Sequence, residues 1–384
     1  MRLFLNVAAM VLLIGPSYAL AGNWWETIKM KGDLRYRHEM IDIEGKDARH
    51  RHRIRARIGI TGEVSPYTKV GIQLATGSDD PVSTNQTLDN AFSTKQVGID
   101  LAYFEAYHDA TPGLTITGGK FKNPFFRPGS SQLIWDSDWN PEGGAATYKR
   151  DMDRFSIMLT GSGLWIYERS SGDDSYIGAG QAVGRFHFNE KKSSIAVGGG
   201  YFNYANTEGF EVFYNPMKSK GNSGSPVVDT SAVVDTLGNI SIEYDTTSYK
   251  YATDFDCFEL FVEATHTFDN ISVTVMVDYV TNRAADSLRS GWLVGFKAGK
   301  MKKPGSWEAR YTYRNLKKDA VVGIFTHSDF GGGGTDAKGH EIGGAVQLAT
   351  NTAFKVTCFI TEIGLQGDET ENYKKLQVDL QLKF

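Results

Sequence analysis

The chain has 384 residues, of which 41% are hydrophobic, and its formal net charge is −4 with a pI of about 6.1. Nucleic-acid-binding proteins usually carry a basic excess, so this balance argues against that class and we expect no nucleic-acid partner. Two cysteines, Cys257 and Cys358, are too few for a disulfide scaffold. The length predicts two or three ordinary domains or one large β domain.

The first residues have the features of a signal peptide. Arg2 precedes a short apolar run at 3–14, and the sequence Ala-Leu-Ala at 19–21 is a small-residue cleavage site. We therefore expect residues 1–21 to be removed on export, leaving 22–384 as a single domain. No later run approaches the ~20 apolar residues of a membrane helix. The mature chain is then either soluble and secreted or inserted as a β-barrel.

Alternation of apolar and polar side chains with period 2 dominates the rest of the chain, which is typical of β-strands. The stretch "RHRHRIRARIGITGEV" is an example: arginine occupies every odd position from Arg49 to Arg57, and the even positions change from histidine to Ile54, Ala56 and Ile58. The sixteen predicted strands cover residues 27–39, 51–63, 68–77, 97–109, 113–121, 143–150, 153–164, 176–188, 193–206, 255–268, 271–283, 289–301, 304–316, 338–350, 353–365 and 371–384.

Every second connection between these strands is a tight turn, and the others are mostly long. The long loops are 78–96, 122–142, 165–175, 207–254 and 317–337. A soluble sandwich has no reason to sort its loops in this way. Outer-membrane barrels do, with short periplasmic turns, long extracellular loops and an even number of strands. Closure removes the sheet edges, and sixteen strands leave an aqueous channel. The sequence therefore predicts an all-β fold, a transmembrane antiparallel β-barrel.

Five segments resemble a bacterial family of outer-membrane porins with sixteen-stranded, general-porin-like barrels. They are "GDLRYRHE" (32–39), "RHRIRARIGITGEV" (51–64), "LATGSDDPVSTNQTL" (74–88), "GKFKNPFFRPGSSQLIWDSDWNPEGGAATY" (119–148) and "DAVVGIFTHSDFGGGGTDAKGHEIG" (319–343). The resemblance covers nearly the whole mature chain. It implies passive passage of small hydrophilic solutes and ions through a Gram-negative outer membrane, without a cofactor. It also implies a homotrimer among outer-membrane lipid and lipopolysaccharide.

The arginine row has a clear place in such a barrel, because odd positions would face the aqueous lumen and even positions the lipid. The neighbouring strand adds further charges to the same inner face. We define the arginine wall as Arg35, Arg37, Arg53, Arg55 and Arg57. Asp33 partly counters it. A basic wall favours anions at equal solute size, so we expect a mild anion preference.

The segment 122–142 follows the fifth predicted strand, so it is the third connection on the outer side. In porins that this sequence resembles, the third outer loop folds into the barrel and narrows it. It carries Asp136, Asp138, Glu142 and Arg127. Acidic groups that face a basic wall would filter solutes by charge at the narrowest point. The complete set of expected pore-lining residues is Arg35, Arg37, Arg53, Arg55, Arg57, Asp33, Asp136, Asp138, Glu142, Arg127, Arg310 and Arg314. In the alternative, the arginines only solvate the lumen and the acids lie in a surface loop.

Other interpretations stay open at this point. Asp136, Asp138 and Glu142 are close enough in sequence to be a weak calcium candidate, although they lack EF-hand spacing, so no metal site is expected. The run "GGGG" at 331–334 lacks the lysine of a phosphate loop and is interpreted as a flexible outer-loop tip. Neither a Ser-x-Gly elbow nor an HExxH motif supports an enzyme.

The sequence leaves two other functions open and predicts one further partner. A substrate-specific channel for phosphate, a sugar or an organic acid would show saturable conductance. A barrel adhesin or enzyme would act through its long loops, of which 207–254 is the largest. The final strand ends in the aromatic Phe384, a type of C-terminal strand that barrel-assembly machinery commonly recognises.

Overall fold

The computed structural model describes residues 24–234, 240–367 and 369–384. The expected signal peptide at 1–21 lies outside the described residues. Strands dominate the described part of the chain, and the helical elements in it are short 3-10 turns. No described helix is long and apolar enough to cross a membrane.

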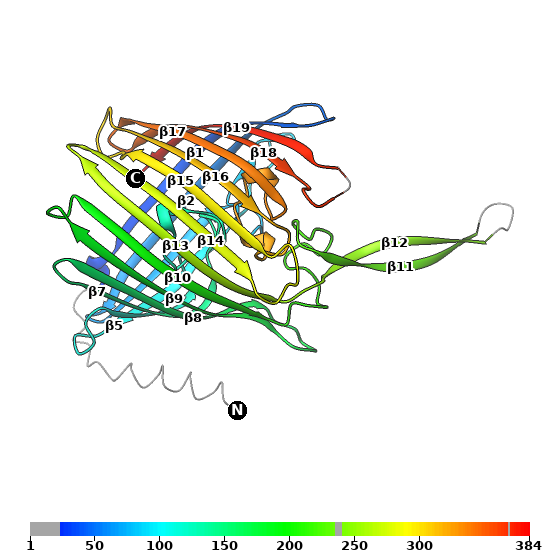
Figure 1. Ribbon diagram of the computed structural model, residues 1–384, viewed down its shortest axis with the longest axis horizontal. Coiled ribbons are helices and arrows are strands. Elements are labelled where there is room, and N and C mark those ends of the chain that lie inside the picture. The colour runs from blue at the N-terminus through cyan, green and yellow to red at the C-terminus, as the bar shows by residue number, and fades with distance from the viewer. Residues whose placement is uncertain (1–23, 235–239, 368) are drawn as a thin grey trace.

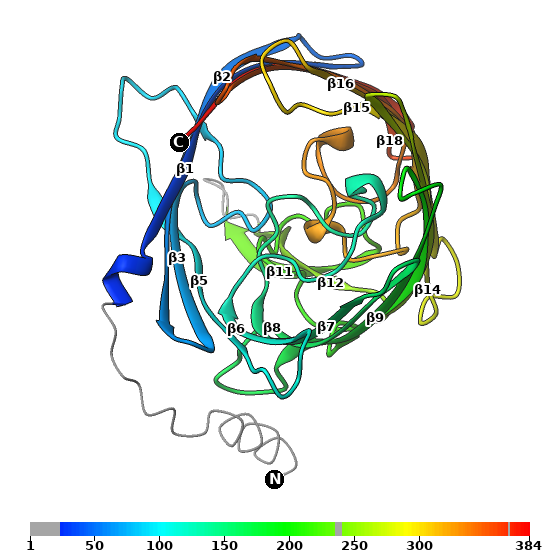
Figure 2. The ribbon, with the colours of Figure 1, turned by 90° about the vertical axis from the view of Figure 1, so that its left-hand side faces the viewer.

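Sixteen long strands form a closed antiparallel barrel (Figures 1 and 2). They are β1 (Lys29–Ile43), β2 (Arg49–Ser65), β3 (Thr68–Thr76), β5 (Val97–Tyr107), β6 (Leu114–Lys120), β7 (Glu142–Asp151), β8 (Phe155–Tyr167), β9 (Ser175–Phe188), β10 (Ser193–Ala205), β13 (Phe255–Phe268), β14 (Ile271–Asn282), β15 (Ser290–Gly299), β16 (Trp307–Leu316), β17 (Ala337–Ala349), β18 (Thr352–Ile363) and β19 (Glu371–Lys383). The two-residue strand β4 (Gln86–Thr87) pairs with β2.

Each long strand pairs with its neighbours along the chain, and the last strand pairs with the first. β19 lies antiparallel to β1, with Arg37 opposite Asp379. The seam extends to the last residue, since the backbone N–H of Gly32 donates to Phe384 O at 2.8 Å and the N–H of Phe384 donates to Gly32 O at 3.1 Å. None of these sixteen strands is therefore an edge strand. Strands that span a membrane require this closure, because unpaired backbone N–H and C=O groups are costly in hydrocarbon. All sixteen predicted strands are confirmed to within a few residues.

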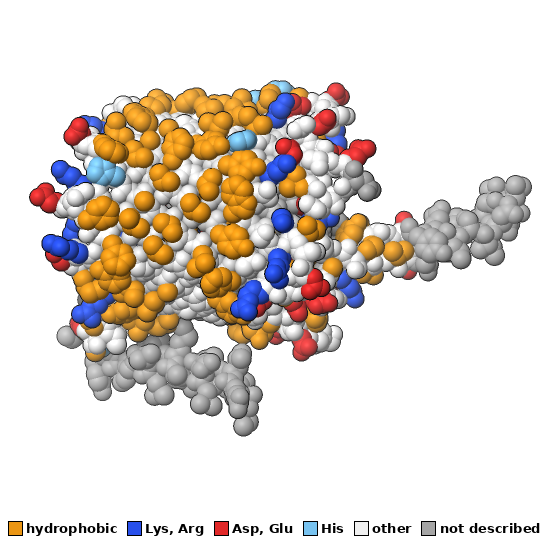
Figure 3. Space-filling view, viewed as in Figure 1, with side chains coloured by type: hydrophobic (Ala, Val, Ile, Leu, Met, Phe, Trp, Pro, Cys, Tyr) orange, Lys and Arg blue, Asp and Glu red, His pale blue; other side chains and the backbone are white. Residues whose placement is uncertain are grey.

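The two faces of the wall differ as alternation predicts. Leu34, Tyr36, Ile58 and Ile60 are among the exposed large apolar side chains, whereas the interleaved Arg55 is only 5% exposed. Figure 3 shows apolar side chains spread over the visible outer face of the barrel, with charged groups gathered toward its two ends. This is the surface expected of a barrel whose outside contacts lipid and whose inside contacts water.

The long connection 207–254 contains two strands that the sequence interpretation missed. β11 (Gly224–Val234) and β12 (Ile240–Tyr251) form a separate antiparallel sheet. This hairpin extends away from one end of the barrel (Figure 1). In the sequence analysis, 207–254 is placed among the long loops, although segments such as "ISIEYDTTSYKY" do alternate.

Two connections enter the lumen instead of lying outside it (Figure 2). We call them inner loop A (residues 121–141) and inner loop B (residues 317–336). Inner loop A includes the short turn η2 (Pro128–Ser130), and inner loop B includes η3 (Gly323–Phe325) and η4 (Phe330–Gly332). The turn η2 contacts β13, β14 and β15, and η4 contacts β17, β18 and β19.

The interpretation of 331–334 as an outer-loop tip is therefore wrong. All four glycines have positive φ, from 59° at Gly331 to 105° at Gly334, a conformation that side-chain-bearing residues rarely adopt. A Cβ at Gly331 would collide with Ile363, and one at Gly334 would collide with the backbone of Lys220. The glycines thus allow inner loop B to turn tightly inside the barrel.

Candidate functional site

The arginine wall lies on the inner face of β1 and β2. In the antiparallel register Arg35 is opposite Arg55, and Arg37 is opposite Arg53. Like charges directly across a sheet repel, so the arrangement needs acidic partners. Asp33 supplies one: its carboxylate accepts bonds from Arg55 Nη2 at 2.8 Å and from Arg57 Nε at 2.7 Å.

Arg37 is held from two directions. Its guanidinium makes two parallel bonds to Asp379 on β19, at 2.6 and 2.7 Å, and Nη1 donates to Asp329 of inner loop B at 3.1 Å. Asp329 also accepts from Lys375 Nζ at 2.6 Å. These neighbouring positive charges lower the pKa of Asp329 well below its ordinary value, against the opposing effect of burial. Ion pairs therefore fix inner loop B to the wall.

Asp138 of inner loop A faces the wall as the sequence analysis expected. Its Oδ1 lies 3.5 Å from Arg55 Nη1 and 3.4 Å from Arg57 Nη1. The remaining arginines contact the loop after β3: Arg35 donates to the Asn85 side chain, and Arg53 Nη2 donates to Asn85 O at 3.1 Å. The predicted acid–arginine apposition is thus present for Asp138.

Asp136 does not face the wall. It is 3% exposed, and its two carboxylate oxygens accept the backbone N–H groups of Asp138 and Ser328, each at 2.7 Å. Its own N–H donates to Phe325 O at 2.8 Å. Burial raises the pKa of Asp136 to about 7. This residue joins the two inner loops, because it bonds to both.

Glu142 lines a cavity of about 490 Å³ together with Asp138, but it makes no ion pair with an arginine of the wall. It is the first residue of β7, its side chain is 61% exposed, and it pairs with Lys120 at 2.8 Å. The expectation that it lines the constriction with Asp136 and Asp138 is wrong. In the described residues no group of three or more His, Cys, Asp or Glu side chains could hold a metal ion, so the calcium alternative has no geometric support.

Arg127, Arg310 and Arg314 hold backbone of inner loop A. Arg127 donates to Trp135 O at 3.2 Å, and Arg310 Nη1 lies 3.4 Å from the carbonyl oxygens of residues 129 and 130. Arg314 is 1% exposed, donates to the backbone of residue 132 and lies 3.9 Å from the ring centre of Phe330 in inner loop B. These arginines position the loops instead of forming part of the wall.

Carboxylates on the opposite side of the barrel also hold inner loop A. Glu263 on β13 accepts the N–H of Gly129 at 2.6 Å and pairs with Arg185 at 2.8 Å. Asp278 on β14 accepts the hydroxyl of Ser131 at 2.7 Å. The loop is therefore bonded at several points along its length.

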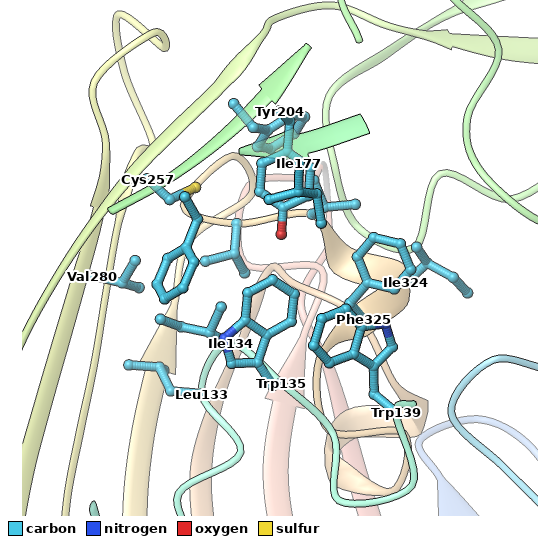
Figure 4. Packing of buried hydrophobic residues seen from close by; sticks show 14 of the residues in the cluster. Leu133, Ile134, Trp135, Trp139, Ile177, Tyr204, Cys257, Val280, Ile324 and Phe325 are labelled. Carbon is cyan, nitrogen blue, oxygen red and sulfur yellow. The ribbon is translucent and has the colours of Figure 1, made fainter. Parts of the chain in front are cut away.

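Apolar side chains from both inner loops and from the barrel strands form a buried cluster inside the lumen, the apolar plug (Figure 4). Its members include Leu133, Ile134, Trp135, Trp139, Ile177, Phe202, Tyr204, Cys257, Val280, Ile324 and Phe325. Trp135 stacks on Trp139 with ring centres 4.1 Å apart. The sequence analysis missed the plug, although "LIW" and "AVVGIF" are apolar runs inside otherwise polar loops.

The open space lies along the other side of the lumen. A cavity of about 350 Å³ is lined by Asp33, Arg57, Lys122 and Lys383, among others. A smaller one of about 180 Å³ is lined by Arg51, Arg53 and residues of inner loop B. The wall thus borders these two cavities, and two others of about 490 and 380 Å³ lie along β3, β5, β6 and β7, whereas the plug fills the region beside β9, β10, β13 and β14.

Comparisons with known proteins agree with this architecture. Residues 42–384 match the model of the family described as "Putative porin". No curated protein matches the chain. Among solved structures, OprB of Pseudomonas putida superposes with a TM-score of 0.59 at 10% identity, covering 94% of each chain. OmpF of Salmonella typhi superposes with a TM-score of 0.53 at 13% identity, covering 93% of this chain and 97% of that one.

At these identities the solved structures establish the fold alone, and the family match supplies the assignment. The closed barrel, the apolar outer face and the charged lumen are what a diffusion channel in an outer membrane requires. The chain belongs to this porin family and is an outer-membrane barrel for the passive diffusion of small hydrophilic solutes.

Proposed function

We propose that solutes cross the barrel along the arginine wall and that its charge gives anions a mild advantage. The observation that carries this proposal is the surplus of basic groups at the wall. Acidic neighbours of the wall are Asp33, Glu39, Asp80, Asp100, Asp138, Asp329 and Asp379. The basic groups there are Arg35, Arg37, Arg51, Arg53, Arg55, Arg57, Lys122, Lys220, Lys355 and Lys375. A narrow passage lined by such an excess attracts anions and repels cations.

The reversal potential in a potassium chloride gradient across a planar bilayer tests this proposal. We expect a potential that favours chloride, reduced in the double variant Arg55→Gln and Arg57→Gln. Lys191→Gln is the matched control, since this exposed lysine lies in the turn between β9 and β10, away from the wall. A strongly cation-selective wild-type channel would contradict the proposal.

The family assignment also supports several finer proposals about assembly. Cleavage after Ala21, assembly into a homotrimer and contact with lipopolysaccharide all follow the pattern of outer-membrane porins. The exposed Phe384 at the β1–β19 seam is a suitable signal for barrel-assembly machinery. N-terminal sequencing of the purified protein tests the cleavage, and chemical cross-linking of intact membranes tests the trimer.

A second candidate function is adhesion through the β11–β12 hairpin, which projects beyond the barrel (Figure 1). Deleting all of 207–254 would not isolate this role, because Val212 and Phe213 belong to the apolar plug and Asn222 bonds to Val321 O at 2.8 Å. Deleting residues 228–247 removes the outer part of the hairpin alone. Loss of cell attachment with unchanged conductance would support adhesion.

A further inference from the structure

We propose that the cavity of about 180 Å³ beside the outer half of β2 is a binding site for small oxyanions, namely phosphate or short carboxylates. We call it the outer cavity. The proposal rests on the proposed function, because it places a selective step on the anion-favouring path along the arginine wall. Five parts of the chain meet there: β2, the loop after β3, the segment around Lys220, inner loop B and β19.

Four basic side chains line the outer cavity: Arg51, Arg53, Lys220 and Lys375. They come from three separate parts of the chain, so the fold, and not one local run of sequence, brings them together. Arginine supplies a planar fork that matches carboxylate and phosphate geometry, and lysine supplies a mobile point charge. This combination is suited to a small anion with several oxygen atoms.

One of these groups, Lys220, has no ionic partner among the described residues. Within the described part of the chain, Lys220 Nζ makes no ion pair within 4.0 Å, whereas Lys375 bonds to Asp329 and Arg51 bonds to Glu39. Arg53 is paired more loosely, since its Nη1 lies 3.7 Å from Glu39 and its Nη2 donates to Asn85 O at 3.1 Å. Lys220 therefore carries the charge that a bound oxyanion would neutralise.

The remaining lining suits a small polar ligand. Ser83, Thr326 and Ser328 contribute hydroxyl groups, and the backbone of 332–334 borders the cavity without side chains. A volume of about 180 Å³ is below the ~300 Å³ at which pockets for drug-sized ligands begin. The outer cavity therefore fits an ion of a few atoms better than a sugar.

Two acidic groups also line the cavity and must be reconciled with anion binding. The charge of Asp329 is compensated by Arg37 and Lys375 at 3.1 and 2.6 Å. Asp80 accepts the N–H of Val82 at 3.0 Å, and burial raises its pKa above the ordinary value. Asp329 is therefore neutralised by its own cations, and the four basic side chains outnumber the two carboxylates that line the cavity.

Titration of inorganic phosphate against the chloride current of wild-type channels in planar bilayers tests the site. We expect a saturable fall in current as phosphate occupies the outer cavity. A parallel titration with succinate compares a carboxylate with phosphate. The ion that blocks the chloride current at the lower concentration is the preferred ligand. A current that is unaffected by either ion overturns the proposal.

The variants Arg53→Gln and Lys220→Gln localise the effect. Each should raise the half-blocking concentration about tenfold, because each removes a charge-assisted contact. Lys220 lies in a loop, so its substitution should leave the barrel strands intact. It therefore still tests the site if Arg53→Gln fails to fold. Lys191→Gln is the control and should block like wild type.

These experiments distinguish a failure of the outer-cavity proposal from a failure of the proposed function. If the channels prefer chloride to potassium but both variants are blocked like wild type, the outer cavity is not the site and the proposed function stands. If wild-type channels show no preference for chloride, the proposed function fails, and the outer cavity loses its place on an anion path.

Discussion

The two sides of the same lumen are built on different chemistry. Along β1, β2 and β19 the inward positions carry paired charges such as Arg37 and Asp379. Along β9, β10, β13 and β14 they include Ile177, Phe202 and Cys257, which belong to the apolar plug, and Glu263 and Asp278, which bond to inner loop A and not to wall arginines. Both sides follow the same inward and outward alternation. Alternation therefore establishes the barrel, and the identity of the inward residues decides whether a region holds water or protein.

This difference shows how the pore is narrowed. Inner loops A and B are bonded to the wall through Asp138 and Asp329, and their large apolar side chains, Trp135 and Phe325 among them, are buried in the apolar plug. Burial of large apolar side chains is worth more than partly solvated ion pairs. The plug should therefore determine the width of the passage, and the wall its charge preference.

The largest expected effect follows from opening the plug. Trp135→Ala removes a 1% exposed aromatic side chain and should destabilise the packed loops by about 3–5 kcal/mol. We expect a wider passage, measured as an increase in single-channel conductance, together with a lower thermal unfolding temperature. Trp165→Ala is the matched control, because Trp165 is 56% exposed on the outer surface. Unchanged conductance would mean that the plug does not set the width.

A smaller effect is expected from the glycine turn that keeps inner loop B in place. Gly334→Ala forces a side chain onto a residue with φ of 105° and against the backbone of Lys220. Strain of this kind costs about 1–3 kcal/mol. We expect faster proteolysis within inner loop B. Gly344→Ala, where a Cβ would meet open space, serves as the comparison and should leave the proteolysis rate unchanged.

The junction of the two loops should be sensitive to pH through Asp136. The pKa of Asp136 in the folded protein, about 7, lies above its ordinary value, so folding favours the protonated carboxyl. Its contribution to the free energy of unfolding is therefore fully present below about pH 4 and is lost as pH rises through about 7. Burial lowers the pKa of the nearby His327 to about 4, so this histidine remains neutral in that range. Thermal unfolding of wild type should therefore weaken by a few degrees between about pH 6 and about pH 8.

Asp136→Asn provides the comparison for this pH effect. The variant has no carboxylate to ionise at the junction, so its unfolding temperature should fall less over the same range. Equal slopes in the two proteins would show that Asp136 does not titrate there.

The smallest expected change concerns selectivity at the wall. Asp33→Asn removes the shared counter-charge of Arg55 and Arg57 and should raise the preference for chloride over potassium roughly twofold, measured as a reversal potential. Asp109→Asn, in an exposed turn outside the lumen, should have no such effect. A preference that does not change in Asp33→Asn would indicate that ions pass elsewhere in the lumen.

Much of this architecture could be predicted from the sequence, because strand alternation and the sorting of loop lengths are local signals. The inward side of the arginine row follows from a period of 2, and so does its pairing with Asp33 on the adjacent strand. Asp138 facing the wall depended on the family resemblance, which places the third loop in the lumen.

The missed features depend on contacts between distant segments. Nothing near inner loop B in the sequence reveals that Phe325 packs against Trp135, 190 positions earlier. Asp136 and Asp138 are two residues apart, yet one is buried at the junction and the other faces arginines. Glu142 was misplaced because β7 begins at that residue, where its side chain pairs with Lys120 of the adjacent strand β6 and not with a wall arginine.

The ion pairs between wall arginines and the carboxylates of Asp33 and Asp379 should affect the noise of the open-channel current. A free arginine side chain samples many rotamers, worth about 2 kcal/mol of entropy, and would present a fluctuating charge to each passing ion. Asp379 holds Arg37 through two short hydrogen bonds, and Asp33 accepts hydrogen bonds from both Arg55 and Arg57. These bonds restrict the rotamers of the three arginines. A permeating ion would meet a nearly static field, so open-channel noise should be low.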